Sequence, residues 1–134
     1  MKRVLFVLAL LALATPALAQ TKPVNPTSVE WTDPNDYATV TSWQVGFFVS
    51  GATTPVQTPV DLGKPALVTT GCTVSPCLKA SINTQPVPFG MNYVARIRTV
   101  VTVSGAPLYS EWSDEGTTAF FERRPGKPGG TVVK

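Results

Sequence analysis

The feature that most constrains the fold is the stretch YVARIRTVVTVSGAPLYSEW at positions 93–112. β-Branched and aromatic residues lie on both sides of a Gly/Pro break at 104–107, which predicts two long strands joined by a turn, a β-hairpin. In the first strand apolar Tyr93, Ala95 and Ile97 occupy alternate positions. This period of two predicts that they face a core, while the residues between them face the other way.

The rest of the chain also reads as short apolar runs, separated by many of its 13 prolines and 10 glycines. Further strands are expected at 28–32, 40–50, 56–62, 66–69 and 78–82, and the hairpin brings their number to seven. No long apolar segment with a helical period follows residue 19. The pattern therefore predicts one all-β domain, a seven-stranded antiparallel β-sandwich.

The amino-terminal residues resemble a targeting segment rather than part of the domain. A basic start, Met1-Lys2-Arg3, precedes an apolar run at 4–14 and the small-residue ending Ala17-Leu18-Ala19. These are the three parts of a secretory signal peptide, with cleavage after Ala19. A membrane anchor is the alternative, but it needs about 20 apolar residues. We expect a secreted or periplasmic protein without membrane insertion, whose domain covers residues 20–122.

The formal net charge of +3 misrepresents the domain. Residues 21–122 contain five basic side chains and all eight acidic ones. The last twelve residues, RRPGKPGGTVVK at 123–134, contain four basic side chains and no acid. The acidic balance of the domain argues against nucleic acid as a partner. The Gly/Pro-rich basic tail is expected to be disordered.

The two cysteines, Cys72 and Cys77, enclose Thr-Val-Ser-Pro. Two close thiols in an exported protein are expected to form a disulfide bond. A structural zinc site needs four ligands, and the chain has no histidine and no further cysteine. A redox motif would have two intervening residues instead of four. The bridge should pin a local loop.

The sequence offers little for catalysis, because the absence of histidine removes the commonest general base. A carboxylate pair drawn from Glu111, Asp114 and Glu115 is the remaining option, but strand-end and turn positions normally face water. The cluster 33–36 is a turn rather than a calcium loop, because no distal carboxylate follows at the required spacing. We expect no enzyme activity and no cofactor.

Within 40–50, alternation places Trp43, Val45 and Phe47 on the core face. Phe48 falls on the opposite face and is the candidate exposed aromatic residue of a binding surface. Cover from a neighbouring segment is the alternative explanation for an aromatic side chain at this position.

Several motifs resemble those of fibronectin type III domains. The run VPFGMNYVARIRT at 87–99 is similar to the turn and tyrosine strand of that family, SVEWTDP at 28–34 to its second strand, and SWQVGFF at 42–48 to its third. The stretch YSEWS at 109–113 is similar to the Trp-Ser-x-Trp-Ser element of cytokine-receptor modules. Together these motifs span most of the expected domain, although 51–77 departs from the pattern.

The resemblance implies roles for particular side chains. Tyr93 would be the tyrosine corner, its hydroxyl bonding back to upstream backbone. Arg96 and Arg98 would stack on Trp112 and Tyr109, which is a structural role. Basic and aromatic residues interleaved in this way could also form the surface of a single-strand nucleic-acid binder, but the resemblance favours the stack within the domain.

The functional expectation is a secreted, non-catalytic binding or adhesion module, which contacts an extracellular protein or glycan through a sandwich face or end loops. The alternative is a structural subunit of an extracellular homo-assembly, joined by edge strands or tails.

Overall fold

The computed structural model describes residues 22–122, apart from 84 and 87. The expected signal peptide and basic tail lie outside the described residues. Within this part of the chain the fold is all-β, with seven strands and no helix. The strands are β1 (Ser28–Trp31), β2 (Ser42–Phe48), β3 (Val60–Gly63), β4 (Leu78–Ser81), β5 (Met91–Val103), β6 (Ala106–Tyr109) and β7 (Thr118–Phe121). No described segment forms a helix of the length and apolarity that crossing a membrane requires.

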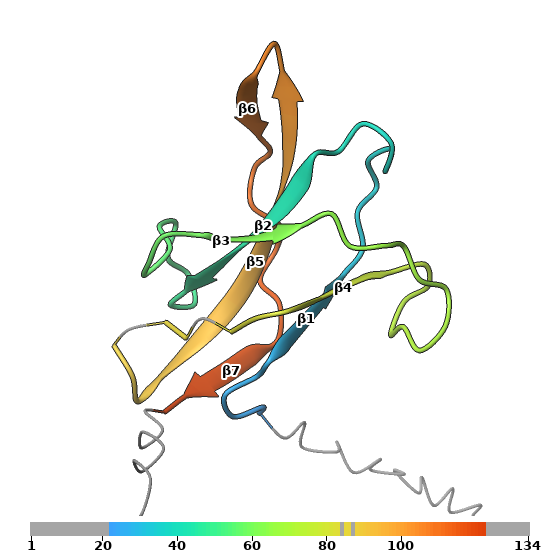
Figure 1. The fold of residues 1–134 in the computed structure, drawn as a ribbon. Helices are drawn as coiled ribbons and strands as arrows, with labels where there is room; N and C mark the ends of the chain where they lie inside the picture. Colours follow the sequence, from blue (N-terminus) through green and yellow to red (C-terminus); the bar gives the residue numbers. More distant parts are fainter. Residues whose placement is uncertain (1–21, 84, 87, 123–134) are drawn as a thin grey trace, which may run out of the picture.

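The strands form two antiparallel sheets (Figure 1). One contains only β1 and β4, and the other has the order β3-β2-β5-β6, with β7 also paired to β5. The long strand β5 lies at the centre of the larger sheet. One edge pairs with β2, and the other pairs with β7 at its start and with β6 at its end.

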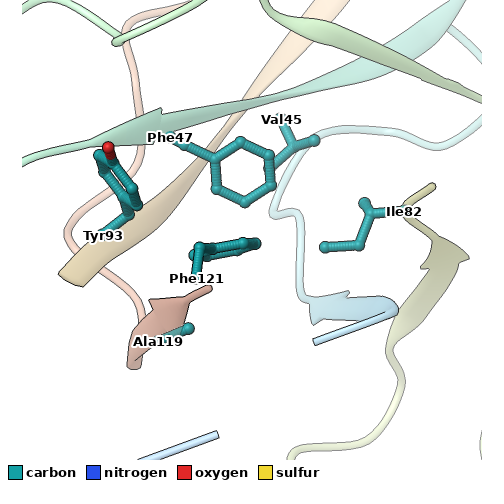
Figure 2. Packing of buried hydrophobic residues seen from close by; sticks show 6 residues of the cluster. All are labelled: Val45, Phe47, Ile82, Tyr93, Ala119 and Phe121. Carbon is teal, nitrogen blue, oxygen red and sulfur yellow. The ribbon is translucent and has the colours of Figure 1, made fainter. Parts of the chain in front are cut away.

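Side chains from both sheets meet in the core, which is consistent with a β-sandwich. Phe47, Tyr93 and Phe121 pack edge to face in one cluster (Figure 2). The ring centroid of Phe121 lies 5.2 Å from that of Phe47 and 5.7 Å from that of Tyr93. In a second cluster Trp31 of β1 meets Trp43 of β2 at 6.0 Å. Edge-to-face contact suits aromatic rings because it brings the positive edge of one toward the negative face of the other.

The hairpin prediction is confirmed for its first strand and wrong for the length of its second. The turn occupies only Ser104 and Gly105, both with positive φ, as the favoured two-residue hairpin turn requires. The strand β6 then ends at Tyr109 after four residues. Pro107 fits in β6 because this strand is at the sheet edge.

One further strand expectation is wrong, and one strand was not predicted. Residues 66–69 form no strand, and Val68 makes only an isolated bridge to Cys77. The seventh strand is instead β7, which the sequence reading did not assign. Prolines at 55, 59 and 65 leave little continuous main chain for pairing, whereas β7 lies beside the start of β5.

Candidate functional site

Tyr93 makes the hydrogen bond that defines a tyrosine corner. Its hydroxyl donates to the carbonyl of Pro88, five residues upstream. The ring is 1 % exposed, and burial raises the pKa of the hydroxyl. The side chain therefore joins the core to the turn before β5 and is inaccessible to a ligand.

The predicted disulfide bond between Cys72 and Cys77 is confirmed. It closes the loop that leads into β4, and main-chain hydrogen bonds of 2.9 Å join Val68 to Cys77 in both directions. The amide of Thr73 donates to Glu30 of β1 at 2.6 Å. The bridged loop is thus fixed against the smaller sheet.

The arginines of β5 contact aromatic rings on the outer face of the larger sheet. The guanidinium of Arg98 lies 4.1 Å from the ring centroid of Tyr109 and 4.6 Å from that of Trp112. Its Nε and Nη2 atoms also donate to Gln44 at 3.0 and 2.8 Å. Arg96 takes a different ring from the one expected, because it lies 5.0 Å from the centroid of Phe48.

The hypothesis that Phe48 belongs to an exposed binding surface is wrong, and the alternative, cover from a neighbouring segment, is confirmed. Alternation placed it correctly on the face opposite the core, but its side chain is fully buried. The ring of Trp112 packs edge to face against it with the ring centroids 5.2 Å apart, and the Arg96 guanidinium lies over the Phe48 ring at 5.0 Å from its centroid. Phe48 therefore cannot serve as a binding surface in this conformation.

Two serines that sequence reasoning missed hold this cover in place. The hydroxyl of Ser110 accepts from the amide of Thr99 at 2.9 Å, and that of Ser113 accepts from Ile97 at 3.0 Å. The serine amides in turn donate to the carbonyls of the same partners at 3.0 and 2.8 Å. The hydroxyls thus replace carbonyls that a paired strand would supply.

The spacing of these contacts explains the path of segment 110–117. Ser110, Ser113 and Gly116 recur every three residues, whereas their partners on β5 recur every two. One additional residue per step is what a β-bulge introduces, so regular pairing stops after Tyr109. The Ser-x-x-Ser spacing at 110–113 was the available signal.

Glu115 joins segment 110–117 to the rest of the outer face. Its carboxylate accepts hydrogen bonds from Gly51 N at 2.6 Å, Ser50 Oγ at 2.8 Å and Arg96 Nη2 at 3.0 Å. These hydrogen bonds hold the pKa of Glu115 below its ordinary 4.5, and the bond from the Gly51 amide has the largest effect. Its contacts thus tie segment 110–117 to the loop after β2 and to β5.

A carboxylate with a lowered pKa stabilises the folded state above its unfolded-state pKa, and this contribution is lost as pH falls through the folded-state value. We expect Glu115→Gln to have a lower Tm than the unaltered chain at pH 6. The two Tm values should converge as pH falls well below 4.5, which a thermal unfolding series would measure. Glu111→Gln, from the same segment, is the control. A Tm difference that persists unchanged at low pH would contradict the role of the Glu115 charge.

Asp33 forms a second polar centre, which the sequence reading treated only as part of a turn. Its carboxylate accepts from Trp43 Nε1 at 2.5 Å, Thr99 Oγ1 at 2.6 Å and Asn35 N at 2.8 Å. Burial raises the pKa of this carboxyl, but the hydrogen bonds from Thr99, Asn35 and Trp43 outweigh burial and lower it overall. The chain bends at Asn35, within the predicted turn, and the main-chain hydrogen-bonded turn follows at 36–39; Asp33 anchors this connection to the core.

The face best placed for a ligand is the far end of the β5–β6 hairpin, which projects beyond the rest of the molecule (Figure 1). Val101 pairs with Leu108 and Val103 pairs with Ala106, so these four side chains share one face. This shared face continues the core-facing side of β5 beyond the point where the smaller sheet ends. Val103 is 50 % exposed and Leu108 is 57 % exposed. We call these four residues the arm face.

The carboxylates considered for catalysis are not gathered into a metal-binding cluster in the described part of the chain. No group of three or more His, Cys, Asp or Glu side chains between residues 22 and 122, with 84 and 87 left aside, is arranged to hold a metal ion.

No protein-family model matches the chain, and no curated protein or solved structure matches it significantly.

Proposed function

We propose that this chain is an exported, non-catalytic binding module of the fibronectin type III class, which holds an extracellular protein or glycan. Support for the class comes from the Tyr93–Pro88 hydrogen bond, the Arg98 stack and two packed antiparallel sheets. Support for export comes from the signal-like residues 1–19 and from a disulfide bond, which oxidising compartments favour.

The arm face carries the binding proposal. Exposed apolar side chains that lie together on a projecting element are typical of interaction surfaces, whereas singly scattered ones are ordinary. The arm is built on the central strand β5, so its backbone is positioned by the main sheet. A ligand that covers Val103 and Leu108 would remove apolar surface from water, which favours association.

A pair of matched substitutions tests this surface. Leu108→Glu should weaken binding about 30-fold, because an anchor residue of an interface contributes about 2 kcal/mol. Leu67→Glu changes a leucine of similar exposure, 49 % against 57 %, outside the arm face. The unaltered protein is first screened on a glycan array and on a panel of purified extracellular proteins, and each hit is titrated with both variants. Equal affinity of the two variants for every hit would refute the arm face as the binding surface.

The alternative, a subunit of an extracellular homo-assembly, is supported by the edge strand β3, which pairs only with β2 among the described strands. Light scattering of the mature protein separates the two functions. A strict monomer at high concentration removes the assembly hypothesis and leaves the binding module.

A further inference from the structure

A cleft of about 620 Å³ opens between β1 and segment 113–117. Its floor includes Ala95, Ile97 and Ala119 of the larger sheet. Ala95 and Ile97 face inward, as the buried Tyr93 does, yet both remain half-buried. The physical reason is the unequal width of the sheets, because two strands cannot cover the inner face of five. The cleft is therefore an uncovered part of the core.

The edge of β1 beside this cleft has main-chain groups that no described residue pairs. The Ile82 amide bonds to the Thr27 carbonyl at 2.8 Å, so Thr27 and Ile82 are a hydrogen-bonded pair. Antiparallel pairing alternates, and the register continues through Val29↔Ala80 and Trp31↔Leu78. The amides of Ser28 and Glu30 consequently point away from β4, toward the cleft. The cleft thus has the space and the hydrogen-bonding edge for one more strand.

Charge around the cleft is acidic. Glu30 and Asp114 line it, and no described lysine or arginine does. Glu30 is already paired with Lys79 at 3.3 Å, whereas Asp114 lies at an exposed position. An extended segment with apolar side chains and positive charge would complement this site in both shape and charge.

Residues 123–134 of this chain have that chemistry. They contain four basic side chains and no acidic one, and they include the β-branched run Thr131-Val132-Val133. β-Branched residues favour extended backbone. The segment also starts close to the cleft, because Phe121, two residues before it, lines the cleft. The residues just before β1 lie beside this point, because the Asn25 amide donates to the Phe120 carbonyl at 2.9 Å and Asn25 Oδ1 accepts from the Glu122 amide at 3.1 Å.

We propose that Thr131–Val133 of the same chain enters the cleft and adds to the free edge of β1 as a third strand of the smaller sheet. The intervening residues 123–130 can span about 26 Å when extended, and β1 is only about 13 Å long. Entry from the Phe121 end makes the added strand parallel to β1. Attachment to the same chain gives the segment a high effective concentration at the cleft. This inference does not depend on the ligand of the arm face.

Amide hydrogen exchange, measured by NMR on the full mature chain, tests this assignment. With the third strand in place, the Ser28 and Glu30 amides should exchange at least tenfold more slowly than in the Val132→Asp/Val133→Asp variant. The Val29 and Trp31 amides, which face β4, should be slow in both proteins and so report that the domain remains folded. The control Val132→Ile/Val133→Ile keeps β-branched apolar side chains and should retain protection.

Three results would overturn the proposal. Fast exchange of Ser28 and Glu30 in the unaltered chain would show a free edge. Slow exchange that persists in the aspartate variant would assign the cover to another segment. Protection that disappears on tenfold dilution would assign the strand to a second copy instead of the same chain. Protection that is independent of concentration and lost only with aspartate supports it.

Discussion

Replacement of Asp33 by alanine is expected to lower the free energy of unfolding by about 3 kcal/mol. The carboxylate accepts from Trp43 and Thr99, whose residues are 1 % and 8 % exposed. Without it the indole N–H has no acceptor, and a buried donor left unsatisfied costs about 1–3 kcal/mol. The link between the β1–β2 turn and the central strand is lost at the same time. Urea denaturation at pH 7, with the slope compared between variants, measures the change.

Asp36→Ala is the matched control for this prediction. The residue belongs to the same turn and accepts from the amide of Ala38 at 3.1 Å in an exposed setting. Its loss should cost about 1 kcal/mol or less, as for an ordinary hydrogen bond. If the two alanine variants were equally stable, the buried network around Asp33 would have no special weight.

Local periodicity was sufficient to predict the core face of the central strands. Tyr93 and Phe47 both lie where alternation placed them, in one aromatic cluster. Alternation also assigned Phe48 to the outer face, yet it could not predict burial there. Whether that face is covered depends on Trp112, 64 positions away, and thus on a long-range contact that no local pattern encodes.

The candidate site was predicted less well than the fold for a similar reason. The disulfide bond follows from two cysteines close in sequence, but the arm face depends on where the smaller sheet stops. The alternating pattern puts Ile97 and Val103 on the same face of β5, yet Ile97 packs against the core and Val103 is exposed to solvent. Only the arrangement of the two sheets distinguishes these positions.

Trp112→Ala is the second substitution expected to have a large effect, lowering the free energy of unfolding by about 2–3 kcal/mol. Truncation of a buried tryptophan costs about 3–5 kcal/mol, and this ring is half-buried. Its removal exposes Phe48, which is otherwise fully buried, and takes one ring from Arg98. Tyr109→Ala removes the other ring, which is 49 % exposed, and should cost only about 1 kcal/mol. Equilibrium denaturation of both variants gives the comparison.

Gly46 allows the packing part of this effect to be separated from the cation–π part. A Cβ at this position would lie 2.8 Å from Phe48 Cε2 and 3.0 Å from Trp112 Cη2, so Gly46→Ala forces the rings apart. Overpacking of this kind costs about 1–3 kcal/mol. In the Trp112→Ala background Phe48 has room to move, and the cost of Gly46→Ala should fall by at least half. Additive costs would contradict packing of Trp112 against the strand and leave the Arg98 contact as its main contribution.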